Sequence, residues 1–247
     1  MSTYFIKGAS LLGERVADIL IEDGKIARIG HDIETADAQV VDASGQIALP
    51  GLVDIHTHLR QPGYEASETV ETGTRAAALG GYTAVFAMAN SLPVADTAAV
   101  VEQVNRLGKE SGWCRVQPIG SVTVGLKGEF LSDIGSMATS DAKVRVFSDD
   151  GMCVYDPAIM RRALEYVKTF DGVVAQHAQE PRLTEGAQMN EGKVSADLGL
   201  TGWPAVAEEA IIARDVLLAE HLNSRLHICH LSTKGSVEVV RWAKSRG

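Results

Sequence analysis

Strand-like and helical stretches alternate along most of this chain, and that alternation limits its fold more than any other feature. After Pro50, short runs rich in Val, Ile and Ala take turns with longer stretches of helical spacing. Repeats of this kind give a parallel sheet covered by helices, because parallel strands need a crossover connection. The strand-like runs are LVDIHTH (52–58), YTAVFAMAN (82–90), CRVQPIGSVTV (114–124), KVRVFSDD (143–150), VVAQHAQE (173–180) and RLHICHLS (225–232).

The stretches between these runs carry helix signals. Asp156 precedes Pro157, which predicts an N-cap followed by a proline at the first helical position. Ile159, Ala163 and Val167 then recur at every fourth residue and predict an apolar face. Helices are expected within 68–81, 96–111, 156–170, 204–223 and 236–247.

Two folds are built from such repeats, the doubly wound sheet and the (β/α) barrel. The first strand is not followed by G-x-G-x-x-G, the phosphate-binding signature of many doubly wound sheets. Polar side chains instead follow several different strands, at the end where barrels place their sites. We therefore expect an α/β fold in which residues 50–247 form an incomplete (β/α) TIM-type barrel, with about six of the eight units.

Residues 1–49 show a different pattern. Short apolar runs are broken by Gly, Asp-Gly and Ser-Gly turn signals, and no helical spacing is present. This predicts a small β-rich segment ahead of the barrel.

Composition excludes several classes of protein. The formal charge of −9 and the pI of about 5.3 argue against a nucleic-acid or anionic-membrane surface. No run of about 18 apolar residues predicts a membrane span, and the first residues do not resemble a secretory signal. Three cysteines without a C-x-x-C pair favour reduced thiols. We expect a cytoplasmic protein with a small-molecule substrate.

The stretch His-Thr-His at 56–58 ends the first strand. Residues two apart in a strand point to the same face, so His56 and His58 would present their imidazoles side by side. Such a pair suits a metal ion, although polar surface histidines would give the same pattern.

Further potential ligands follow later strands. His227 and His230 are three residues apart and would face opposite ways in a strand, so only one can enter a shared site. We choose His230, at the strand end, and expect His227 to be structural. With Asp150 and His177, the set exceeds what one tetrahedral ion needs, which favours two cations, with Asp150 as the bridge.

Arg60 and Asn90 are candidate substrate-binding residues. A guanidinium two residues past His58 could offer two N–H donors to a substrate carboxylate, or could simply pair with a neighbouring acid. Asn90 could add an amide donor, although an Asn at a strand end is often a turn residue.

Five separated motifs resemble, in order and spacing, those of the dihydroorotases in the amidohydrolase superfamily, the bacterial class with an SDDG motif. The resemblance implies a metal-bearing barrel beside a small β-sandwich and two zinc ions. It implies that His56 and His58 hold one zinc, that Asp150 bridges to the second, and that His177 and His230 hold the second. The motifs are LPGLVDIHTHLRQPG, GYTAVFAMANS, VRVFSDDG, VAQHAQEPRL and HICHLST.

The chemistry implied by the resemblance is the reversible hydrolysis of dihydroorotate to N-carbamoyl-aspartate in pyrimidine biosynthesis. A metal-bound hydroxide attacks the cyclic amide while Arg60 and Asn90 grip the substrate carboxylate. Gln61 and Ala89 depart from the usual HLREPG and MPNT patterns and affect fine positioning. The family's proton-transfer aspartate lies on an eighth strand, so we assign no catalytic residue in this sequence and expect a truncated or split enzyme.

Two other functions stay open from the sequence. One is a catalytically silent homologue that partners another pyrimidine-pathway enzyme, and the other is a hydantoinase-like or dihydropyrimidinase-like cyclic amidase. Those amidases bridge their metals with a carbamylated lysine, and VRVFSDDG contains no lysine. A homo-oligomer is also compatible with the sequence, since unclosed strands would leave open edges.

Overall fold

The computed structural model describes residues 2–35 and 37–247. The chain divides into two compact units, Met1–Gly51 and Leu52–Gly247. Across the described residues, none of the helices combines the length and hydrophobicity needed to span a bilayer.

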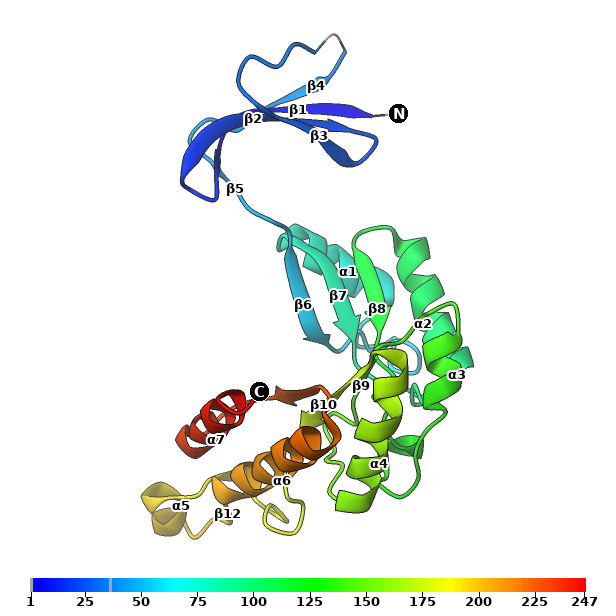
Figure 1. The fold of residues 1–247 in the computed structure, drawn as a ribbon, viewed down its shortest axis with the longest axis vertical. Coiled ribbons are helices and arrows are strands. Elements are labelled where there is room, and N and C mark those ends of the chain that lie inside the picture. The colour runs from blue at the N-terminus through cyan, green and yellow to red at the C-terminus, as the bar shows by residue number, and fades with distance from the viewer. Residues whose placement is uncertain (1, 36) are drawn as a thin grey trace. The chain divides into compact units, whose positions relative to one another are not determined.

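The first unit is a five-stranded sheet (Figure 1). Its first three strands pair antiparallel, and the last two pair parallel to β1. Asp23 and Gly24 connect β2 to β3 with φ of 51° and 73°, the conformation for which Asp-Gly is favoured in tight hairpins. The strands are β1 (Thr3–Leu11), β2 (Arg15–Glu22), β3 (Lys25–Gly30), β4 (Gln39–Asp42) and β5 (Ile47–Ala48).

The second unit contains six parallel strands whose spatial order follows the chain (Figure 1). Three of them form the sheet β6-β7-β8 and three form the sheet β9-β10-β13, and a parallel bridge from Gly120 to Phe147 links the two. In the described part of the chain, β6 and β13 are the outer strands of this arrangement. The strands are β6 (Leu52–Thr57), β7 (Tyr82–Ala87), β8 (Arg115–Pro118), β9 (Val146–Phe147), β10 (Val173–His177) and β13 (Leu226–Cys229).

Helices connect successive strands and cover the sheets. Asp156 caps its helix by accepting from the backbone N–H groups of Ala158 and Ile159, with Pro157 at the first helical position, which confirms the sequence prediction there. Ala163 and Val167 of the predicted apolar face are fully buried. The α-helices are α1 (Val70–Leu79), α2 (Ala98–Ser111), α3 (Ile134–Thr139), α4 (Pro157–Val167), α5 (Lys193–Leu198), α6 (Val206–Leu222) and α7 (Lys234–Lys244).

The sequence prediction missed several short elements. α3 completes the third unit, and the segment between β10 and α6 folds around α5 with a two-stranded pairing of β11 (Met189–Asn190) and β12 (Gly202–Trp203). The 3-10 turn Val124–Leu126 was also not predicted, and the predicted helical stretch 156–170 ends in a second 3-10 turn, Lys168–Phe170. Elements of two to six residues are too short to show a period in sequence.

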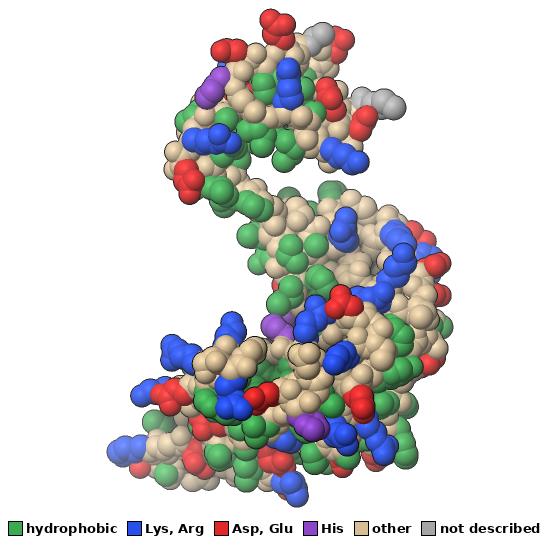
Figure 2. Space-filling view, in the orientation of Figure 1, with side chains coloured by type: hydrophobic (Ala, Val, Ile, Leu, Met, Phe, Trp, Pro, Cys, Tyr) green, Lys and Arg blue, Asp and Glu red, His purple; other side chains and the backbone are tan. Residues whose placement is uncertain are grey.

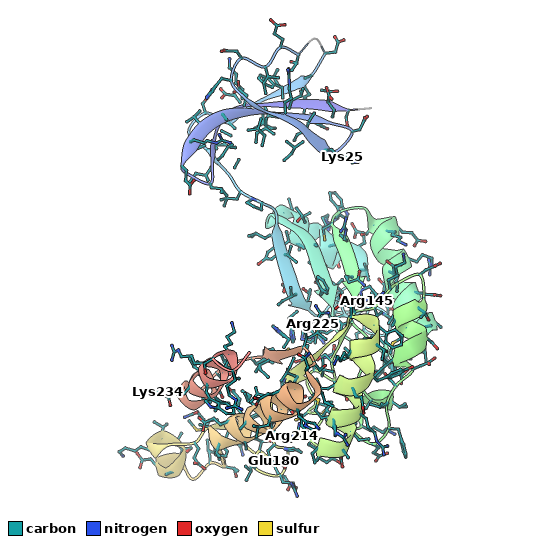
Figure 3. The ribbon with its side chains drawn as sticks, in the orientation of Figure 1. Lys25, Arg145, Glu180, Arg214, Arg225 and Lys234 are labelled. Atoms are coloured by element: carbon teal, nitrogen blue, oxygen red, sulfur yellow. The ribbon has the colours of Figure 1, made fainter. Side chains whose placement is uncertain are left out.

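A buried polar cluster ties the end of β10 to α6 and to the loop after β9. Gln176 donates to the Asp215 carboxylate at 2.9 Å, and Arg214 pairs with the same carboxylate at 2.6 Å. Arg214 also donates to the carbonyls of Val154 and Tyr155 (Figure 3 labels Arg214 on α6). The loop with Val154 and Tyr155 follows Asp150, and Gln176 directly precedes His177. The hydrogen bonds of this cluster therefore fix the chain beside two of the candidate ligands.

We expect Asp215 to make the stability of the protein fall as pH rises from about 4 to 6. Burial raises the pKa of Asp215 from 3.8 to about 6, although the Arg214 guanidinium opposes the rise. Between these two values the folded state binds more protons than the unfolded state, so raising the pH lowers the free energy of unfolding, by up to about 3 kcal/mol. Urea unfolding of the wild type and of Asp215→Asn at pH 4 and pH 7 measures this.

In Asp215→Asn the position no longer titrates, so its share of the pH dependence should vanish. Equal pH dependence of unfolding in the two proteins would contradict a raised pKa at Asp215.

Candidate metal centre

The five predicted metal ligands all lie at the carboxyl ends of strands. The His56 side chain comes from β6 and His58 follows it; Asp150 follows β9, His177 ends β10, and His230 follows β13. Parallel strands in chain order bring these ends to the same edge of the sheets. The structure thus brings these five side chains, which are far apart in the sequence, close together.

Asp150 lies at the centre of this cluster, and each of its oxygens faces two imidazoles. Oδ2 lies 3.3 Å from Nε2 of His56 and 3.4 Å from Nε2 of His58. Oδ1 lies 3.0 Å from Nδ1 of His177 and 2.9 Å from Nε2 of His230. The carboxylate therefore joins two groups of three ligand atoms, and within each group the atoms lie within 4.8 Å of one another.

The Asp150 side chain is buried, with 4% of its surface exposed. Burial alone would raise its pKa, but the hydrogen bonds with His177 and His230 outweigh burial and hold the pKa well below its usual value. Burial lowers the pKa of His56, and the hydrogen bond to Asp150 raises the pKa of His177. An ionised carboxylate among imidazoles is the state that binds a divalent cation.

His56 gives an independent sign that a cation fits here. Its Nε2 atom is buried and has no hydrogen-bond partner among the described residues, and its separation of 3.3 Å from Asp150 is long for a hydrogen bond. Buried polar atoms are normally satisfied. Two nitrogens and one carboxylate oxygen in each group make a donor set that suits zinc and similar divalent ions.

The two candidate substrate-binding residues differ in their contacts. Asn90 contacts the cluster, because its Oδ1 lies 3.0 Å from Nδ1 of His58. Arg60 is exposed, has a φ of 47°, and its side chain makes no hydrogen bond or ion pair among the described residues. His227, expected to be structural, is outside both ligand groups.

Sequence reasoning missed the residues that hold the ligands in place. Asp149 accepts from the backbone N–H groups of Val122 and Thr123, which fixes the loop that carries Asp150. Glu208 of α6 is buried and accepts from the backbone of Ser232 and Thr233, just after His230. The helical stretch 204–223 contains four acidic residues, and its sequence does not show that Glu208 is buried.

A cavity of about 910 Å³ lies beside the cluster. Figure 2 shows the face of the second unit hollowed between β6 and α7, with a histidine side chain in the hollow. Of the five candidate ligands only His56 lines this cavity, and neither Arg60 nor Asn90 does. Its walls include Ile55, Phe86 and Trp242, so it is mainly apolar.

The sequence of this chain matches a known protein family and several known proteins. Residues 45–236 match the model of a family described as dihydro-orotase-like. The chain is 70% identical over 247 residues to a dihydroorotase of Streptomyces coelicolor and 57% identical over 236 residues to one of Mycobacterium tuberculosis. These matches cover 100% and 95% of this chain but 58% and 55% of those proteins, so the chain spans a little over half their length.

Solved structures share the fold at lower sequence identity. An L-hydantoinase (dihydropyrimidinase) from Arthrobacter aurescens matches with a TM-score of 0.79 and 23% identity, over 100% of this chain and 57% of that one. A dihydropyrimidinase from Brevibacillus agri matches with a TM-score of 0.73 and 23% identity, over 99% of this chain and 55% of that one. At this identity the likeness establishes the α/β fold alone.

Proposed function

Because the chain belongs to the dihydroorotase-like family, we propose that it carries the metal centre of a dihydroorotase, a cyclic amidohydrolase that interconverts dihydroorotate and N-carbamoyl-aspartate. The observation that carries the proposal is the position of Asp150, with each carboxylate oxygen facing a pair of histidine nitrogens. A carboxylate is the ligand able to join two cations about 3.5–4 Å apart.

The residues present fit a pair of divalent cations, which we propose to be zinc. His56 and His58 would hold one with Asp150, and His177 and His230 would hold the other with the same carboxylate. When bound, such a pair polarises a carbonyl and supplies a nucleophile at neutral pH.

Arg60 and Asn90 are proposed to select the substrate. A guanidinium can offer two parallel N–H donors to a carboxylate, which dihydroorotate and carbamoyl aspartate both carry. Asn90 presents Oδ1 to His58, so its Nδ2 amide group is available to the same carboxylate. Among the described residues we assign none to proton transfer at the leaving nitrogen.

We interpret the six parallel strands as six of the eight units of a barrel, over residues 50–247, and residues 1–49 as part of a β-sandwich. The outer strand β6 carries the exposed apolar residues Val53 and Ile55, and Leu231 is exposed just after the other outer strand, β13. In this interpretation those edges are covered in the whole protein. A homo-oligomer or a complex with another pyrimidine-pathway enzyme stays a prediction.

The hydantoinase alternative has less support. Its structural matches are near 23% identity, whereas the dihydroorotase relatives reach 70%. The silent-homologue alternative requires loss of metal binding, and the cluster keeps four histidines as potential ligands around one carboxylate.

Zinc binding and substrate preference together test the proposal. Metal-free protein titrated with Zn²⁺ against a chromophoric chelator should take up two equivalents, and the loaded protein should bind dihydroorotate in preference to hydantoin. A protein that binds no zinc would support the silent homologue, and equal binding of both compounds would support a hydantoinase-like enzyme.

A further inference from the structure

His177 has a hydrogen-bond partner on the side of its ring that faces away from Asp150. Its Nδ1 atom lies 3.0 Å from Asp150 Oδ1, and its Nε2 atom lies 3.0 Å from Gln179 Oε1. A neutral imidazole carries one proton, so a nitrogen that binds a cation leaves that proton on the other nitrogen. If Nδ1 binds a cation, Nε2 must donate, and Gln179 Oε1 is in place to accept.

The orientation of the Gln179 amide is fixed by Thr184. Gln179 Nε2 lies 2.8 Å from Thr184 Oγ1, and this buried hydroxyl lies 3.2 Å from the carbonyl of Glu180. In this chain of bonds every donor meets an acceptor. With the amide reversed, Gln179 would aim a donor at His177 Nε2, and Thr184 would have to turn its proton away from Glu180.

We propose that Gln179 is a positioning residue of the metal centre, which accepts the Nε2 proton of His177 and leaves Nδ1 free for the cation shared with Asp150 and His230. The inference rests on the proposed function, since it takes this group to bind a cation. Histidine ligands usually donate their outer N–H to such a partner, which fixes the ring and raises its basicity.

In the other ligand group, the side-chain amide of Asn90 contacts His58 and favours the opposite tautomer of the imidazole. Asn90 Oδ1 lies 3.0 Å from Nδ1 of His58, so Nε2 is the nitrogen that faces Asp150 Oδ2. The two amides therefore hold their histidines in opposite tautomers, one for each oxygen of Asp150. This arrangement allows the two cation positions to be weakened separately.

Zinc affinity of the 247-residue chain tests the proposal without relying on activity. Gln179→Leu should weaken binding of one of the two zinc equivalents about 10- to 100-fold and leave the other unchanged. Asn90→Leu should weaken the other equivalent, and the double variant both. Gln179→Glu keeps an acceptor at the same place and should bind zinc at least as tightly as the wild type. Gln188→Leu, the same substitution at an exposed position, should bind as the wild type does.

The outcomes separate this inference from the proposed function. Two zinc equivalents bound by Gln179→Leu with wild-type affinities would overturn the role of Gln179 and leave the metal centre standing. No zinc bound by the wild type would overturn the proposed function itself. If Gln179→Leu fails to fold by circular dichroism, Gln179→Glu decides, because a tenfold loss of zinc affinity there would also overturn the inference.

Discussion

Replacing Asp150 with asparagine is expected to abolish the binding of both proposed cations. Each carboxylate oxygen serves one group of histidines, so the substitution damages both groups at once. An asparagine amide offers one neutral oxygen and a nitrogen that does not coordinate, and it leaves no negative charge to offset two divalent cations. The loss of affinity should exceed the 10- to 100-fold typical of an outer partner.

Zinc content after dialysis measures this effect directly. We expect two zinc ions per chain for the wild type and close to none for Asp150→Asn. Asp141→Asn is the matched control, since Asp141 is exposed and lies in the loop before β9, and it should retain both ions. One zinc retained by Asp150→Asn would mean that the carboxylate serves a single cation and is not a bridge.

The alternation of strands and helices could be predicted from the sequence because each long element repeats its spacing of apolar residues several times. The six strands β6, β7, β8, β9, β10 and β13 fall within the predicted runs, and α4 begins at Pro157 after the Asp156 cap, as predicted. The segment 186–203 was not predicted, because β11 and β12 pair only with each other and these strands and α5 are too short to show a period.

Part of the candidate site could be predicted from the sequence for a different reason. Strand parity and strand ends indicated which side chains could meet, and the resemblance to dihydroorotases is confirmed by the family match and the relatives. The sequence did not predict which residues form hydrogen bonds with the ligands or with the backbone beside them. Gln179 contacts His177 and Thr184. Glu208 contacts the backbone of Ser232 and Thr233. No periodicity in the sequence marks residues with such contacts.

Replacing Arg60 with methionine is expected to weaken the binding of dihydroorotate far more than that of hydantoin. Methionine keeps much of the side-chain length but removes the charge that we propose meets the substrate carboxylate. Removing one partner of a charge pair that the bound substrate buries costs on the order of 2–5 kcal/mol, which corresponds to a loss of affinity of roughly 30-fold or more. Hydantoin lacks the carboxylate, so its binding should change little.

Calorimetry of the zinc-loaded protein with each compound measures the difference. Arg60→Lys should recover part of the loss, because an ammonium keeps the charge but cannot offer the two parallel donors. Arg60 is exposed and its side chain makes no ion pair among the described residues, so the substitution should leave the free energy of unfolding nearly unchanged. An equal loss for both compounds would show that Arg60 supports the site without binding the carboxylate, and the preference for dihydroorotate would then have to come from Asn90 or other residues.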